Sequence, residues 1–116
     1  MKNWYKNLKD RYASFSADDQ IGHMVSDLNK AKCLQEGNPG SAKNHLYRAL
    51  ILLDYIIADP KWRAKRGELL RLRESIGSLI VNNHPYGNIE QVMMAAYLMD
   101  AAVYRQFVQN RVKTEH

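Results

Sequence analysis

The chain has 116 residues, of which 46% are hydrophobic and 25% are charged, as in a globular protein rather than a disordered one. This length predicts a single domain with a proper core. The net charge of +5 permits weak attraction to nucleic acid or acidic surfaces, and the single cysteine, Cys33, excludes an internal disulfide. Residues 1–10 lack the apolar stretch of a secretory signal, so we expect a cytoplasmic protein.

Residues 1–15 predict an amphipathic segment with a short helix ahead of the main domain. Its large apolar side chains share one side of a helix, and lysines and arginines occupy much of the rest. The apolar members are Trp4, Tyr5, Leu8, Tyr12 and Phe15. We expect the segment to lie over the main domain, although a helix on a membrane surface has a similar pattern.

The main domain is predicted at residues 16–112, and its first helix begins after Ser16. Ser16 is followed three residues later by Asp19, a good helix start, because the Ser16 hydroxyl can accept an otherwise unpaired backbone N–H. An apolar stripe of helical spacing follows, and Gly-Asn-Pro-Gly at residues 37–40 ends the helix. Gly22 weakens this helix, or lets another helix approach it closely.

The most apolar stretch, residues 42–58, predicts the central helix of a bundle, capped by Ser41. It is apolar on several sides and therefore needs cover from several neighbours. Charged and polar residues interrupt it, and a helix that spans a bilayer needs about 20 predominantly apolar residues. We therefore expect no transmembrane segment.

Asp59 and Pro60 separate this helix from a third one, whose apolar stripe runs from Trp62 to Ile80. A turn at residues 82–87 leads to a fourth helix at residues 89–112, opened by a capping box of Asn88 and Gln91. Residues 113–116 form a charged tail. No strand pattern competes, and the prediction is an all-α, antiparallel four-helix bundle with an additional short N-terminal helix.

The same spacing predicts which side chains fill the core. The largely buried set consists of Leu46, Leu50, Leu53, Ile57, Ile76, Leu79, Ile80, Val92, Met93 and Ala96.

The search for chemistry predicts no enzyme, no metal site and no cofactor. The four histidines do not have the spacing of a metal site, and the chain carries no glycine-rich phosphate loop. His23 and Asp27 are one helical turn apart, which we interpret as a surface hydrogen bond.

Basic residues are concentrated between residues 61 and 73. This run predicts either a solvated face with Trp62 in the core, which we favour, or a surface that contacts phosphates while Trp62 stacks on a base. Without groups that read bases, nucleic acid is not the expected partner. A small basic protein that associates with nucleic acid or acts as a regulatory module remains the alternative function.

Three passages of the chain resemble the flagellin export chaperones of the FliS family. They are KAKCLQEGN (residues 30–38), SAKNHLYRALILLDYII (residues 41–57) and LRESIGSLIVNNHPYGNIEQVMMAAYLM (residues 72–99). Ser75 and Gly77 depart from the resemblance, since they stand where the family's third helix has tyrosines. The resemblance covers about residues 16–108. It implies a bacterial cytoplasmic chaperone that holds the disordered C-terminal segment of flagellin, or a related flagellar export substrate, before secretion.

Surplus hydrophobicity in the central and last helices predicts where such a client binds. Not all of these side chains can face the same neighbour, so some are expected near the surface under residues 1–15, which would act as a displaceable lid. Without residues 1–15 the bundle is then expected to stay folded. The predicted partner-binding residues are Tyr5, Leu8, Tyr12, Ile51, Leu52, Tyr55, Ile56, Met93, Met94 and Tyr97. A bundle of this kind is also compatible with an oligomer.

Overall fold

The computed structural model describes residues 9–81 and 88–100, together with residues 105 and 109. Within these residues the secondary structure is helical and contains no strand, which confirms the predicted all-α class. The helices are α2 (Ala17–Leu34), α3 (Pro39–Ala58), the 3₁₀ helix η1 (Pro60–Lys65), α4 (Arg66–Val81) and α5 (Ile89–Tyr97). Residues 9–13 are also helical and precede the turn into α2.

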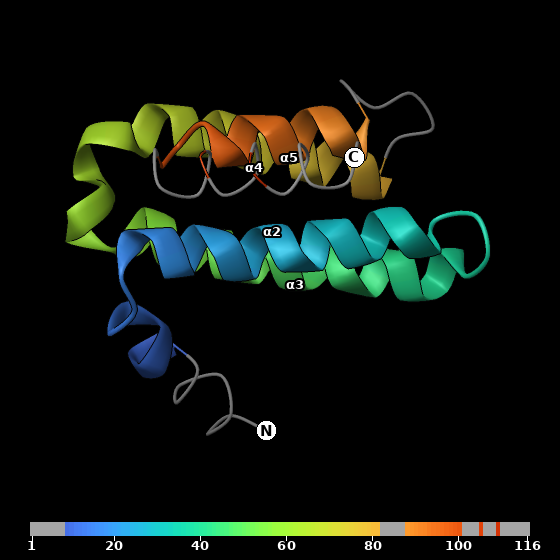
Figure 1. The fold of residues 1–116 in the computed structure, drawn as a ribbon, viewed down its shortest axis with the longest axis horizontal. Coiled ribbons are helices and arrows are strands. Elements are labelled where there is room, and N and C mark those ends of the chain that lie inside the picture. The colour runs from blue at the N-terminus through green and yellow to red at the C-terminus, as the bar shows by residue number, and fades with distance from the viewer. Residues whose placement is uncertain (1–8, 82–87, 101–104, 106–108, 110–116) are drawn as a thin grey trace.

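The four α-helices α2 to α5 surround one core, and each of them packs against two of the others. α2 packs against α3, α3 against α4, α4 against α5, and α5 returns to α2. Figure 1 shows α2 and α3 side by side in one layer, with α4 and α5 in a second layer over them. The segment before α2 leaves this arrangement at one end and lies beside the α2/α3 layer (Figure 1).

Polar caps set the starts of α2 and α5 as the sequence predicts. Ser16 Oγ accepts a hydrogen bond from the Asp19 backbone N–H at 3.4 Å. The capping box of α5 is complete, because Asn88 accepts from the Gln91 backbone at 2.9 Å and Gln91 accepts from the Asn88 backbone at 3.0 Å. α5 ends at Tyr97, because Leu98 is its C-cap and residues 98–100 are not helical, so the predicted continuous helix at residues 89–112 is wrong at this point. Beyond residue 100 only residues 105 and 109 are described, and both are helical.

The start of α3 differs from the prediction by three residues. Asn38 is the cap, and its side-chain oxygen accepts a hydrogen bond from the Ser41 backbone N–H at 3.2 Å. Pro39 occupies the first helical turn, where it has no N–H to leave unpaired and its fixed φ suits the helix. Ser41 therefore lies inside the first turn instead of capping it.

The third predicted helix is two elements, η1 and α4. Asp59 caps η1 by accepting the Lys61 backbone N–H at 3.1 Å, and Pro60 follows in the first turn. The tighter 3₁₀ turn carries Trp62, whose side chain is buried. The regular α-helical stripe starts only beyond Arg66, with Leu69, Leu72, Ile76 and Ile80 buried.

The core contains most of the predicted side chains but is centred on a different face of α3. Of the predicted set, Leu50, Ile57 and Leu79 are only partly buried, and the other seven are buried. The buried residues of α3 are Ala42, Leu46, Ala49, Leu52, Leu53 and Ile56. The prediction chose Leu50 and Ile57 over Leu52 and Ile56 because both choices satisfy helical spacing, and only the positions of α2 and α4 decide between them.

Candidate functional site

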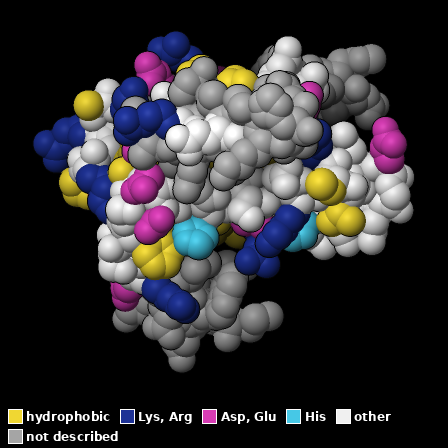
Figure 2. All heavy atoms as spheres, in the orientation of Figure 1, with side chains coloured by type: hydrophobic (Ala, Val, Ile, Leu, Met, Phe, Trp, Pro, Cys, Tyr) yellow, Lys and Arg dark blue, Asp and Glu magenta, His cyan; other side chains and the backbone are white. Residues whose placement is uncertain are grey.

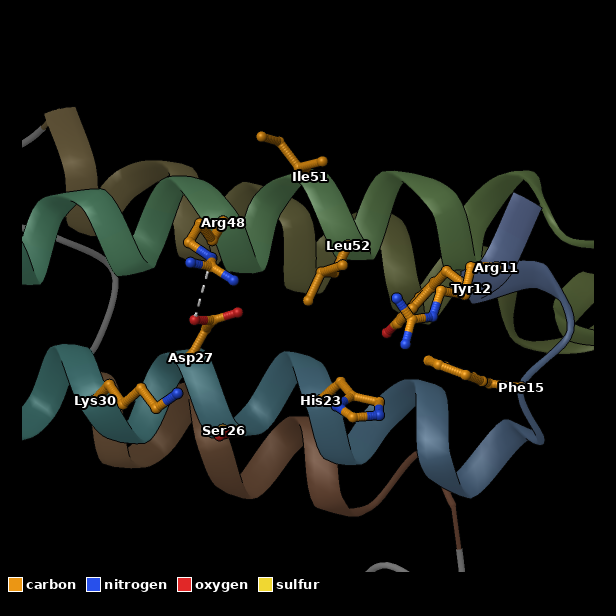
Figure 3. Close-up of a pocket in the computed structure, with 10 residues that line it drawn as sticks. All are labelled: Arg11, Tyr12, Phe15, His23, Ser26, Asp27, Lys30, Arg48, Ile51 and Leu52. Carbon is orange, nitrogen blue, oxygen red and sulfur yellow. Dashed lines mark ion pairs between the residues drawn. The ribbon is translucent and has the colours of Figure 1, made fainter. Parts of the chain in front are cut away.

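A cleft of about 270 Å³ opens between α2 and α3 and is closed at one end by residues 11–15 (Figure 3). We call it the α2–α3 cleft. The apolar part of its lining comes from Tyr12, Phe15, Ile51 and Leu52. The polar part comes from Arg11, His23, Ser26, Asp27, Lys30 and Arg48.

Four rings form the closed end of the cleft. The Tyr12 and Phe15 rings pack edge to face with their centroids 5.8 Å apart. The His23 ring lies 5.1 Å from that of Phe15, and the Tyr55 ring lies 6.1 Å from that of Tyr12. Such aromatic contacts are directional and hold the side chains in a defined arrangement. The N-terminal segment, residues 9–15, thereby packs against both α2 and α3.

A buried polar network attaches this closed end to the bundle. Gln20 is fully buried, and its side-chain amide donates hydrogen bonds to the Tyr12 carbonyl at 2.9 Å and to Asp59 Oδ2 at 3.0 Å. Its side-chain oxygen accepts from the indole Nε1 of Trp62 at 2.7 Å. The Tyr12 hydroxyl donates to the Gln20 carbonyl, which makes the pairing of Tyr12 with Gln20 reciprocal.

Lys61 adds a second attachment from η1 to the N-terminal segment. Its ammonium group donates to the carbonyls of Ala13 at 3.3 Å and Phe15 at 2.5 Å, and it lies 3.5 Å from Asp59 Oδ2. Burial raises the pKa of the Asp59 carboxyl, but the hydrogen bonds from Gln20 and Lys61 outweigh it and hold that pKa below its usual range. Burial, with a smaller effect of the Asp27 charge, raises the pKa of Tyr12, which keeps its hydroxyl a donor.

Asp27 occupies the floor of the cleft and pairs across to α3. Its carboxylate is buried, with Oδ1 3.1 Å from His45 Nδ1 and 3.7 Å from Arg48 Nε. Figure 3 shows Arg48 reaching from α3 toward Asp27 on α2. The predicted surface pair of His23 with Asp27 is therefore wrong. Asp27 faces the neighbouring helix, whereas His23 packs against Phe15.

The predicted partner-binding residues fall into four groups. Tyr12, Ile51 and Leu52 line the cleft, and Tyr55 contacts Tyr12. Ile56 is fully buried in the core, and Met93 is buried on α5. The half-buried Met94 and Tyr97 are also on α5 and do not line the cleft, while Tyr5 and Leu8 lie outside the described residues. Burial raises the pKa of Tyr97, partly opposed by the charge of Lys32.

The lid prediction needs revision at Tyr12. Only 1% of this residue is exposed, and it shares two hydrogen bonds with the buried Gln20. Displacing Tyr12 would leave buried polar groups unpaired, which costs about 1–3 kcal/mol for each group. Deleting residues 1–15 is thus expected to destabilise the bundle.

Sequence reasoning missed Gln20, Lys61 and the pairing of Asp27 with His45. One signal was present: Gln20 and Asp27 occupy the same helical stripe as Met24 and Ala31, so polar residues stand on an apolar face. A polar residue in such a place needs a buried partner. The partner of Gln20 is Trp62 and that of Asp27 is His45. Both partners are distant in sequence and become evident only in the folded structure.

Among the described residues, two further hollows lie elsewhere on the bundle. One, of about 300 Å³, lies between α4 and α5 beside Leu72 and Val92. The other, of about 360 Å³, lies where the start of α3 meets Leu79 and Ile89. Neither is lined by any of the predicted partner-binding residues, so the α2–α3 cleft is the candidate site.

The described residues contain no group of three or more His, Cys, Asp and Glu side chains that could hold a metal ion. Across the same part of the chain, every helix is too short or too polar to cross a membrane. Comparison of the chain with protein-family models, with curated proteins and with solved structures gives no match.

Proposed function

We propose that this protein holds a segment of another polypeptide in the α2–α3 cleft, as a cytoplasmic chaperone does. The proposed client is the C-terminal segment of flagellin or of a related flagellar export substrate, kept from assembling before secretion. The choice of client rests on the resemblance carried by residues 30–38, 41–57 and 72–99.

The observation that carries the proposal is an apolar stripe on α3 that runs from an exposed position to the closed end of the cleft. Tyr47 is 48% exposed, and Ile51 and Tyr55 are half-buried, so large apolar side chains follow one another at a spacing of four residues. The stripe covers about two helical turns and runs into the cleft at Ile51. A client helix can lay its own apolar face along such a stripe.

The physical gain comes from removing these side chains, and those of the client, from water. Burying apolar surface contributes about 25 cal/mol of favourable free energy for each Å². Part of that gain offsets the entropy that a disordered client loses when it becomes ordered. The expected outcome is a reversible stoichiometric complex, which suits a partner that must later release its client.

The alternative, a nucleic-acid partner on η1 and α4, is weakened by the position of Trp62. Only 5% of this residue is exposed, and its indole N–H is bonded to Gln20, so it cannot stack on a base without leaving the core. Arg63, Lys65 and Arg66 are exposed there, and they supply phosphate attraction without sequence readout.

Titration calorimetry of the full chain with a flagellin C-terminal segment tests the proposal. We expect one-to-one binding that Ile51→Asp weakens at least about tenfold, because a carboxylate then enters the apolar contact. Leu70→Asp is the matched control, since Leu70 is 46% exposed on α4, away from the cleft. If the folded wild-type protein fails to bind the segment, or if the two variants bind equally well, the proposal is wrong.

A further inference from the structure

Cations from three separate segments surround the α2–α3 cleft. Arg11 comes from the N-terminal segment, Lys30 from α2 and Arg48 from α3, and all three line the cavity. All three residues are exposed to solvent. Figure 2 shows Lys and Arg, His, and Asp and Glu side chains beside hydrophobic ones on the face that carries the α2/α3 layer.

The cleft contains one carboxylate, Asp27, and it already has partners within the protein. His45 Nδ1 lies 3.1 Å from Asp27 Oδ1, and Arg48 approaches the same oxygen at 3.7 Å. Neither Arg11 nor Lys30 has a carboxylate partner among the described residues. The rim therefore carries an excess of positive charge beside an apolar wall.

Size restricts what can occupy the cleft. Pockets for drug-sized ligands enclose about 300–1,000 Å³, whereas this one encloses about 270 Å³. Tyr12, Phe15, Ile51 and Leu52 provide an apolar wall for a side chain of a bound segment. The positive rim lies where the flanking residues of an inserted chain would pass.

We infer that the α2–α3 cleft selects a peptide segment in which a large apolar side chain is flanked by carboxylates. The apolar side chain inserts against Leu52 and Phe15, and the carboxylates meet Arg11 and Lys30 at the rim. This inference rests on the proposed function and adds the chemistry of the segment that is recognised. Charge-assisted contacts of this kind fix the register of a bound segment and speed its association.

Two synthetic amphipathic peptides separate the charge effect from the apolar one. Both carry the same leucine anchor, flanked by glutamates in one peptide and by the similarly shaped glutamine in the other. Fluorescence anisotropy with the full-length protein should show the glutamate peptide binding about tenfold more tightly at low salt. Raising the salt concentration should reduce that difference, because exposed charges are screened.

Charge reversal on the protein locates the effect. Lys30→Glu and Arg11→Glu should each weaken the glutamate peptide by roughly threefold to tenfold and leave the glutamine peptide within about twofold. Arg66→Glu is the matched control, because Arg66 is exposed at the start of α4 and does not line the cleft. Circular dichroism of each variant checks that it is folded.

The outcomes distinguish this inference from the proposed function. Equal affinity for the two peptides, or equal effects of Lys30→Glu and Arg66→Glu, would overturn the inference. If a flagellin segment nevertheless binds and is weakened by Ile51→Asp, the proposed function stands without it. If the glutamate peptide binds as expected and the flagellin segment does not, the inference holds and the proposed client is wrong.

Discussion

The indole N–H of Trp62 donates a 2.7 Å hydrogen bond to the side chain of Gln20, which lies 42 residues earlier in the chain. Both side chains are buried, and the same Gln20 holds Tyr12 and Asp59. One residue of α2 thus joins the N-terminal segment, the end of α3 and η1. The closed end of the α2–α3 cleft depends on this junction.

Trp62→Phe tests the junction directly. The substitution keeps an aromatic ring in the core but removes the indole donor, so the side-chain oxygen of Gln20 loses its partner. We expect the free energy of unfolding to fall by about 1–3 kcal/mol, measured by urea denaturation. Tyr47→Phe, at an exposed position of α3, is the control and should change it by less than about 0.5 kcal/mol. Equal effects of the two changes would show that the junction contributes little.

Leucine truncations in α3 test which face of this helix is in the core. Leu53 is fully buried, whereas Leu50 is only partly buried. Leu53→Ala should cost about 2–5 kcal/mol, because it removes buried methyl groups and leaves a cavity. Leu50→Ala should cost at least about 1 kcal/mol less, since less of its side chain is removed from water. The opposite order in chemical denaturation would mean that α3 is rotated relative to the structure.

Much of the fold follows from the sequence, because caps and apolar periodicity act locally. Ser16 and the pair Asn88 and Gln91 are read correctly, since the side chains and the backbone groups they satisfy lie three residues apart. The choice between Leu50 and Leu52 was wrong, because it depends on where α2 and α4 lie. Local pattern determines a helix, but neighbouring helices determine its buried face.

The candidate site was only partly predictable for a related reason. Ile51 and Leu52 were identified by counting surplus apolar residues on one helix. Their association with Arg11 and Lys30 needs the packing of three segments, which no spacing within the sequence encodes. The same limit explains why Asp27 was assigned to the nearby His23 when its partner is His45, across the interface between α2 and α3.

Gly22→Ala should stabilise the protein. A Cβ atom built at this position meets no described atom within 4 Å, and its φ is not positive, so the helix gives Gly22 no steric reason to be glycine. Alanine is favoured over glycine inside a helix by roughly 0.5–1 kcal/mol. The expected result is a higher melting temperature in calorimetry. Gly77→Ala in α4 should raise the melting temperature in the same way, because a Cβ atom there also meets no described atom within 4 Å. A lower melting temperature for Gly22→Ala alone would indicate a close neighbour at α2.

Stability should decrease in acid partly through Asp59. Its pKa is held low in the folded protein, so folding favours the charged carboxylate, and this contribution is complete above the unfolded pKa of about 3.9. It is lost as the pH falls through the folded pKa. Urea midpoints of wild type and Asp59→Asn should therefore converge as the pH falls below about 4. A constant difference between them down to lower pH would contradict this role of Asp59.

The central claim is that a client polypeptide occupies the α2–α3 cleft. Methyl NMR of the full-length protein, titrated with a flagellin C-terminal segment, tests it most directly, because Ile51 and Leu52 report on the cleft while Leu70 and Val81 report on exposed positions of α4. We predict saturable shifts of the Ile51 and Leu52 methyl signals, with Leu70 and Val81 unchanged. Shifts at Leu70 and Val81 with none at Ile51 and Leu52 would contradict the account.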